Sequence, residues 1–174
     1  GRGPRQIPDS CRASVYAINL SGQSLCDDQF LDFVVGHLRD SGIAPQRICF
    51  EITETAAIAN LSRAVAFITR FKDMGCRFAL DDFGSGVSSF GYLKNLPVDY
   101  LKIAGNFIQD IAIDPVDHAM VDAINQIGHV MGLKTVAESV ETEGVLTRLR
   151  ALGVDYVQGY GVEMPQPLSP APKP

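Results

Sequence analysis

The sequence predicts an α/β protein made of repeated βα units, and its spacing favours a TIM-like (β/α)₈ barrel with about six of the eight units present. Short runs rich in β-branched or aromatic residues alternate with longer segments of helical period. Polar residues stand where the apolar runs end, as in barrel enzymes. From Asn19, successive polar run-end residues follow after 32, 30, 21, 36 and 20 positions.

The predicted elements alternate in order along the chain. The expected strands are residues 15–20, 48–52, 77–82, 100–104, 134–139 and 156–161. The expected helices are residues 27–39, 61–74, 116–131 and 142–152, with a shorter one over 86–95. Thr142 is a candidate N-cap of the last helix. Glycines just past the helical runs predict left-handed helix ends, at Gly42, Gly75, Gly132 and Gly153.

The spacing by itself leaves two architectures open. A complete barrel of eight units needs about 250 residues, and this chain has 174. The repeat therefore fits either an open α/β sheet or a barrel in which about 60 to 80 residues precede residue 11. The chain begins with Gly and not Met, so we expect a fragment of a longer protein.

The composition predicts one soluble domain over residues 11–168. Residues 1–10 and 169–174 are rich in Pro, Gly and Ser, and we expect disordered or tag-like ends there. The formal charge of −5 argues against binding to DNA or RNA duplexes through a basic surface. No apolar run approaches the ~20 residues of a membrane span.

The four cysteines form no CxxC pair, and free thiols in a reducing compartment are expected. They are Cys11, Cys26, Cys49 and Cys76. This favours a cytoplasmic domain, whose parent protein can still be membrane-anchored.

The strongest local signal for chemistry is the pair Asp81-Asp82 before a glycine-rich turn. Two adjacent carboxylates repel each other unless a cation lies between them, and they suit a pair of divalent ions about 4 Å apart. A helix cap followed by a surface turn is the alternative interpretation.

Glu51, Glu54, Lys102 and Glu138 extend this pattern to other strand ends. Glu51 lies within an apolar strand, for which a solvated edge position is the alternative, and Glu54 stands at or just beyond the strand end, where it can meet the next loop. Lys102 is a lone cation in an apolar strand, suited either to an anionic oxygen or attacking water or to a structural ion pair. Glu138 is the candidate general base.

Together these motifs are similar to those of the EAL domains, the bacterial cyclic-di-GMP phosphodiesterases. The resemblance runs in family order over residues 13–168. It rests on Asn19-Leu20-Ser21, Glu51-Ile52-Thr53-Glu54, Asp81-Asp82-Phe83-Gly84-Ser85-Gly86, Leu101-Lys102-Ile103, Ala137-Glu138-Ser139-Val140-Glu141 and Gln158-Gly159-Tyr160.

The resemblance implies hydrolysis of cyclic-di-GMP to linear pGpG by water that two Mg²⁺ or Mn²⁺ ions activate, in a TIM-like barrel. It implies that the metal ligands are Asn19, Glu51, Asp81 and Asp82. It further implies that Lys102 lies beside the hydrolytic water and that Glu138 is the base. Glu54 resembles the residue that steadies the Asp81-Asp82 loop, and Glu141 and Gln158 resemble substrate-contact or supporting positions.

Two departures from the family pattern favour an alternative, a catalytically inactive cyclic-di-GMP receptor or regulatory module. The Glu-Ala-Leu strand, whose Glu is a further metal ligand, should lie before the start of this chain. Ala104 stands where active members usually carry Asp.

The resemblance also bears on the partners of the domain. It implies a sensor or GGDEF domain upstream, and its dimerisation element resembles residues 87–96. A barrel that lacks two units exposes strand edges, so we expect a homodimer or association through those edges.

Overall fold

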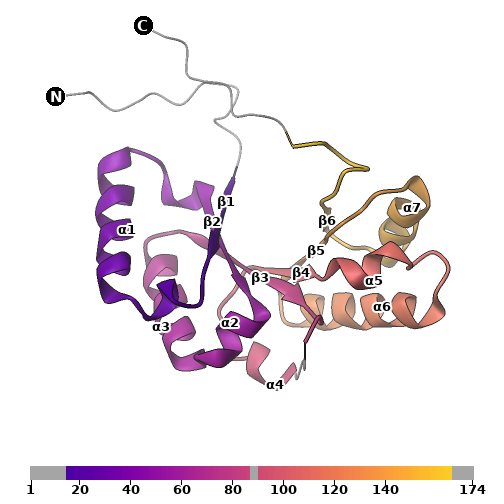
Figure 1. Cartoon of the computed structure of the whole chain (residues 1–174), viewed down its shortest axis with the longest axis horizontal. Coiled ribbons are helices and arrows are strands. Elements are labelled where there is room, and N and C mark those ends of the chain that lie inside the picture. The colour runs from indigo at the N-terminus through magenta and orange to yellow at the C-terminus, as the bar shows by residue number, and fades with distance from the viewer. Residues whose placement is uncertain (1–14, 87–89, 166–174) are drawn as a thin grey trace, which may run out of the picture.

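Six parallel strands follow one another across a single sheet in chain order, which confirms the predicted α/β class with six βα units. The computed structural model describes residues 15–86 and 90–165 (Figure 1). The strands are β1 (Tyr16–Leu20), β2 (Ile48–Thr53), β3 (Arg77–Phe83), β4 (Tyr100–Ile103), β5 (Lys134–Ala137) and β6 (Tyr156–Val157). In the described residues β1 and β6 each pair with one neighbour, so the sheet is open between them.

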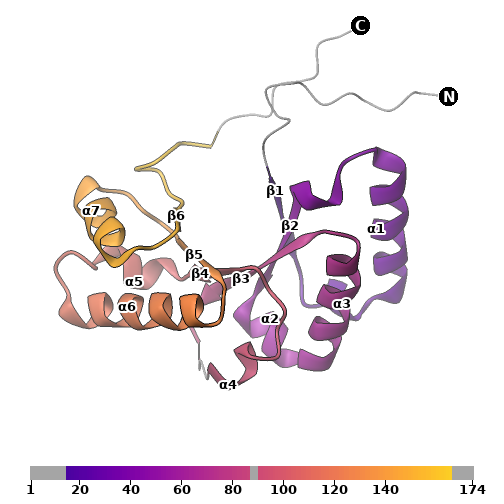
Figure 2. The same cartoon turned by 180° about the vertical axis from the view of Figure 1, so that it is seen from behind.

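The helices connect the strands and flank the sheet in chain order (Figures 1 and 2). Four lie close to their predicted positions: α1 (Asp28–Ser41), α3 (Leu61–Asp73), α6 (Pro115–Val130) and α7 (Glu143–Leu152). The helix predicted over 86–95 is helical only at α4 (Phe90–Leu93) within its described part. Two short helices and two 3₁₀ turns were not predicted: α2 (Glu54–Ala59), α5 (Gly105–Gln109), Ser24–Cys26 and Pro45–Arg47.

Helix ends follow the local rules that the sequence indicated. The Thr142 hydroxyl accepts a hydrogen bond from Val145 N at 3.3 Å and caps α7. The four glycines expected past helix ends all have positive φ angles: Gly42, Gly75, Gly132 and Gly153. Asp114 caps α6, with Pro115 as its first residue.

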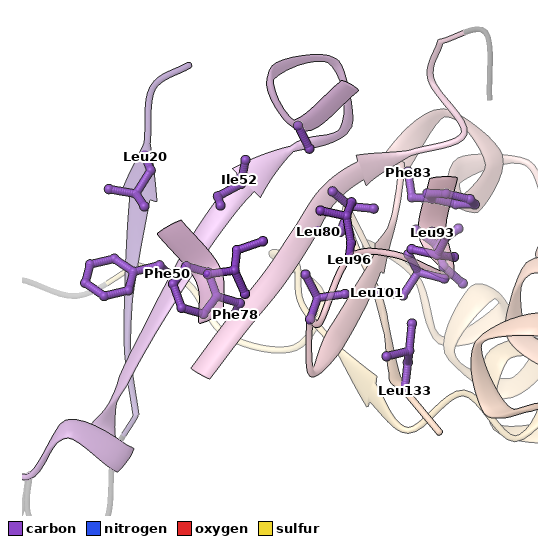
Figure 3. Packing of buried hydrophobic residues seen from close by; sticks show 14 of the residues in the cluster. Leu20, Phe50, Ile52, Phe78, Leu80, Phe83, Leu93, Leu96, Leu101 and Leu133 are labelled. Atoms are coloured by element: carbon purple, nitrogen blue, oxygen red, sulfur yellow. The ribbon is translucent and has the colours of Figure 1, made fainter. Parts of the chain in front are cut away.

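The core lies between the sheet and the helices, because alternate strand residues point to that side. Phe50 of β2 and Phe78 of β3 pack with Phe67 and Phe71 of α3, with ring centroids 4.7 to 6.5 Å apart. Figure 3 shows this layer continuing through Leu80 and other side chains of the later strands. Burial of these large apolar side chains holds the helices against the sheet.

The other face of the sheet is the inner, barrel-side face. Strand residues line a cavity of about 310 Å³ on this face, among them Ala17, Cys49, Glu51, Ala79, Tyr100, Lys102 and Val136.

Cys26, Cys49 and Cys76 are free thiols, and burial raises the pKa of Cys49 to about 12. The buried thiol therefore stays protonated and unreactive.

The last strand is shorter than predicted. The sequence indicated residues 156–161, whereas β6 comprises Tyr156–Val157. Gln158 N still donates to Ala137 O at 2.8 Å, but the chain then passes against the backbone of Val140 and Glu141 at Gly159 and Gly161. A strand with one neighbour and two glycines after it loses its pairing early.

Several expectations lie outside the described residues: the two ends 1–10 and 169–174, Cys11, and part of the expected dimerisation element. Across residues 15–86 and 90–165, no helix has the length and apolar character needed to cross a membrane.

Asp155 ties together the strand beginnings opposite the candidate site. Its carboxylate accepts hydrogen bonds from Lys134 Nζ at 2.7 Å, from Thr135 N at 2.9 Å, and pairs with His129 Nε2 at 2.8 Å. Although burial acts to raise the pKa of Asp155, the contacts with Lys134, Thr135 and His129 outweigh it and hold the pKa below its ordinary value.

Replacing Asp155 with asparagine is expected to lower the free energy of unfolding by about 2 kcal/mol at pH 7. A carboxylate with a lowered folded pKa stabilises the fold above its unfolded pKa of about 4, and this contribution is lost as the pH falls below that value. The difference between wild type and Asp155→Asn should therefore shrink at pH 3. Urea denaturation at both pH values measures it, with Asp28→Asn, an exposed partner of Arg63, as the control.

Candidate active site

Lys102 is the centre of a cluster of carboxylates on the inner face of the sheet. Its ammonium lies 3.0 Å from Glu51 Oε2, 2.7 Å from Asp81 Oδ1 and 2.8 Å from Glu138 Oε1. The four residues come from β2, β3, β4 and the end of β5, and their side chains are at most 16 % exposed. The parallel sheet thus brings together residues that are up to 87 positions apart, since 138 − 51 = 87.

The three carboxylates keep the buried lysine charged. Burial alone would lower the pKa of Lys102, but the contacts with Asp81, Glu138 and Glu51 outweigh burial and raise it above its ordinary value. The cluster has three acidic groups and one ammonium, so it retains excess negative charge and can attract further cations.

A β-bulge places the two adjacent aspartates. Leu80 pairs with Leu101 and Phe83 pairs with Ile103. Between these two pairs β3 advances by three residues and β4 by two, so β3 contains one extra residue. Asp82 takes up the extra step in a left-handed conformation, with φ of 55°. Bulges re-aim side chains at the end of a strand, and here Asp81 points to Lys102 while Asp82 is exposed at the rim.

Glu138 follows β5 directly and faces the ammonium of Lys102. Its backbone N–H donates to Ile103 O of β4 at 3.4 Å. Burial raises the pKa of this carboxyl above the ordinary value, Lys102 acts in the opposite direction, and Asp81 and Asp82 raise it further. A carboxylate with a raised pKa is a better proton acceptor at neutral pH than an ordinary one.

Glu54 connects the start of α2 to the loop after β3. One carboxylate oxygen accepts a hydrogen bond from Gly84 N at 3.0 Å, and the other accepts one from the Tyr92 hydroxyl. Glu54 is 2 % exposed. Through Gly84, Glu54 thus contacts the loop that follows Asp81-Asp82.

The remaining predicted residues lie along the same rim. Asn19 is the register partner of Glu51 across β1 and β2, and it is exposed. Glu138, Glu141 and Gln158 line a rim cavity of about 340 Å³, together with Ser139, Gly159 and Tyr160. Gln158 also lines the inner-face cavity, so the two spaces are adjacent at this residue.

The donor set fits hard divalent cations. Asn19, Glu51, Asp81 and Asp82 offer only oxygen ligands, the type that Mg²⁺ and Mn²⁺ prefer. Asp81 Oδ1 is buried next to Lys102, yet no donor of the described residues points at it with hydrogen-bond geometry, so it retains the capacity to bind a cation. Within those residues, no three acidic, thiol or imidazole groups form a ready-made metal site.

Sequence reasoning missed Tyr92 and the conformation of Ser139. Tyr92 lies in α4, too short a helix to show a period, so nothing indicated its contact with Glu54. Ser139 has a φ of 53°, a conformation that is uncommon for residues other than glycine and that a serine in the sequence does not predict.

A family model described as "EAL domain" matches residues 5–165. The chain is 44% identical over 153 residues to the cyclic di-GMP phosphodiesterase PdeB of Shewanella oneidensis, and 38% identical over 153 residues to the cyclic di-GMP phosphodiesterase PdeF of Escherichia coli. Each alignment covers 88% of this chain, and 18% and 20% of the relatives respectively.

The fold comparison agrees with the sequence comparison. The structure of the PaMucR phosphodiesterase in complex with c-di-GMP matches with a TM-score of 0.83 and 36% identity, over 88% of this chain and 62% of that one. The chain thus spans about a fifth of the curated relatives and under two thirds of this solved domain. With the motifs in order and the six βα units in place, the chain belongs to the EAL domain family.

Proposed function

We propose that this chain carries the hydrolytic site of a cyclic-di-GMP phosphodiesterase, which opens the cyclic dinucleotide to linear pGpG. The observation that supports it is the contact of Lys102 with Glu51, Asp81 and Glu138 on the inner face, beside the rim cavity. The names of PdeB and PdeF and the ligand of PaMucR point to the same substrate.

In the proposed reaction, Glu138 accepts a proton from the attacking water as its oxygen bonds to phosphorus. The phosphorus–O3′ bond breaks, and the leaving oxygen takes a proton from solvent, so one water is consumed and pGpG carries the new 5′-phosphate. Lys102 opposes the effect of burial on the pKa of Glu138 and offers a positive charge to the phosphate. Glu141 and Gln158, at the rim cavity, are proposed to contact the nucleotide.

The residues proposed to hold two Mg²⁺ or Mn²⁺ ions are Asn19, Glu51, Asp81 and Asp82. When bound, such ions supply a nucleophilic water at neutral pH and stabilise charge on the phosphate. Removing them with a chelator should abolish turnover, and either Mg²⁺ or Mn²⁺ should restore it.

Incubation of the full-length protein with cyclic-di-GMP and Mg²⁺ or Mn²⁺, followed by chromatography, tests the proposal. Formation of pGpG that EDTA abolishes is the expected result. Failure to form pGpG with either metal, in protein that is folded by circular dichroism, would contradict it.

One observation favours the second candidate, a receptor that binds cyclic-di-GMP without cleaving it. Ala104 is 2 % exposed and its backbone N–H donates to Phe83 O at 3.2 Å, so it stands beside the Asp81-Asp82 segment without a carboxylate. Micromolar or tighter binding in calorimetry, with no pGpG formed, would support this function in place of hydrolysis.

Replacing Glu54 with glutamine is expected to reduce kcat about 10- to 100-fold, the range seen when a partner of a ligand-bearing loop is lost. The amide cannot accept hydrogen bonds at both of its terminal atoms, so either Gly84 or Tyr92 loses its acceptor. Hydrogen exchange at Gly84 should quicken in parallel. The matched control is Glu143→Gln, whose carboxylate is 78% exposed; equal exchange and kcat in Glu54→Gln and wild type would contradict the role.

We also propose that the domain works in the cytoplasm, that a sensor or GGDEF domain precedes it in the parent protein, and that it self-associates. The unpaired edges of β1 and β6 support association, because Val15, Ile18 and Tyr156 are 45%, 42% and 52% exposed there. Light scattering over a concentration series measures it.

A further inference from the structure

Gly105 and Ser139 lie against each other between the segment that carries Lys102 and the segment that carries Glu138. Gly105 begins α5, three residues after Lys102, and Ser139 follows Glu138. A Cβ atom added to Gly105 would lie 2.4 Å from Ser139 Oγ and 2.9 Å from Ser139 Cβ. Beyond its own helix and chain neighbours, no other heavy atom of the described residues would lie within 4 Å of that Cβ.

The backbone of Gly105 does not itself require glycine. Gly105 does not have a positive φ, and alanine favours a helix more than glycine does. Ser139 is the residue in the unusual conformation, with φ of 53°. Ser139 is therefore the residue that a side chain at position 105 would meet.

The turn that contains Ser139 is also held from its other side. Val140 N donates to Gln158 O at 3.0 Å, and Gly161 N donates to Val140 O at 2.9 Å. A Cβ on Gly159 would lie 2.3 Å from Val140 N, so the chain after β6 already packs directly on this turn. The backbone next to Ser139 is therefore held by the chain after β6, while the Ser139 side chain borders the rim cavity.

We propose that the close contact of Gly105 with Ser139 positions Glu138 against Lys102, making both of them positioning residues for proton transfer. The inference rests on the proposed role of Glu138 as the base. Because Glu138 N also binds Ile103 O, the contact fixes the end of β4 and the turn after β5 as one unit. A displacement of either segment changes the 2.8 Å contact between Lys102 Nζ and Glu138 Oε1.

A double-mutant cycle in the full-length protein tests this with Gly105→Ala, Ser139→Gly and the double variant. Gly105→Ala is expected to lower kcat about 100-fold, the loss that a misplacement of about 1 Å can cause, with little change in KM. Ser139→Gly removes both atoms that the new Cβ meets and suits a positive φ. The double variant should therefore recover at least about tenfold of the lost kcat, an energetic coupling of about 1.4 kcal/mol.

Gly36→Ala is the matched control, because Gly36 also lies in a helix and a Cβ there would meet no atom of residues 15–86 or 90–165 within 4 Å. A purely structural role would lower the melting temperature of Gly105→Ala without rescue of kcat in the double variant. That result, or a wild-type kcat in Gly105→Ala, would overturn the inference.

A measurement without turnover separates this inference from the proposed function. The NMR signal of the Lys102 ammonium, in protein labelled with ¹⁵N-lysine, reports its contact with Glu138. The signal should move in Gly105→Ala and return in the double variant even if wild type forms no pGpG. An unmoved signal in Gly105→Ala would overturn the positioning role alone, whatever the activity.

Discussion

Replacing Lys102 with methionine is expected to lower the free energy of unfolding by about 3 to 5 kcal/mol at pH 7, the cost of removing one partner of a buried ion cluster. Glu51, Asp81 and Glu138 would then converge without the ammonium that now lies within 3.0 Å of each. Hydrolysis should fall at least about 100-fold, because the phosphate also loses a positive charge. Urea denaturation in EDTA and a pGpG assay measure the two effects.

The pH dependence of this loss has a definite sign. Lys102 has a raised folded pKa, so its contribution to stability is complete at neutral pH and is lost only at alkaline pH, above its ordinary value of about 10.4. In Lys102→Met, the raised pKa of Glu138 rises further, because Lys102 no longer opposes the effect of burial. The deficit should therefore be smaller at pH 5 than at pH 7, because a lower pH favours the neutral form of Glu138. An equal loss of unfolding free energy at both pH values would contradict the account. So would a loss in Lys102→Met no greater than in Lys94→Met, the control at an exposed lysine.

Replacing Glu51 with glutamine is expected to reduce kcat at least about 1,000-fold, comparable to the loss of a group that stabilises transition-state charge. Glutamine keeps the shape of the side chain but removes the negative charge that we propose binds a metal ion. The fold should persist, because Lys102 retains Asp81 and Glu138 as partners.

The assay for Glu51→Gln is pGpG formation at saturating Mg²⁺ or Mn²⁺, with the melting temperature measured on the same sample. Glu143→Gln provides the control for loss of a surface carboxylate. Normal turnover by Glu51→Gln would remove Glu51 from the proposed ligand set, and an unfolded variant would call for the same test with Asp81→Asn.

Much of the fold could be predicted because the chain signals it locally. The apolar runs gave all six strands, and glycines with positive φ confirmed the helix ends, since only glycine adopts that conformation at little cost. The short helices α2 and α5 were missed. Each has six residues or fewer, too few for a helical period to be visible, and α2 follows β2 without an intervening turn.

The sequence indicated candidate site residues but not their contacts. Carboxylates at strand ends and Lys102 within an apolar strand are visible in the sequence because such groups are costly to bury alone. The bulge at Asp81 and Asp82 and the left-handed Ser139 were not visible, because neither aspartate nor serine requires a positive φ as a sequence signal. The proposed roles of the individual residues remain predictions for the experiments above.

The sequence by itself determined the family, the repeated βα units and the rim on which the acidic residues lie, since these depend on local periodicity and motif order. Only the tertiary structure decided that Lys102 joins Glu51, Asp81 and Glu138, and that Gly105 must leave room for Ser139. The physical reason is that these contacts join separate strands. Their distances depend on sheet register, a bulge and backbone packing, which no single segment of the chain specifies.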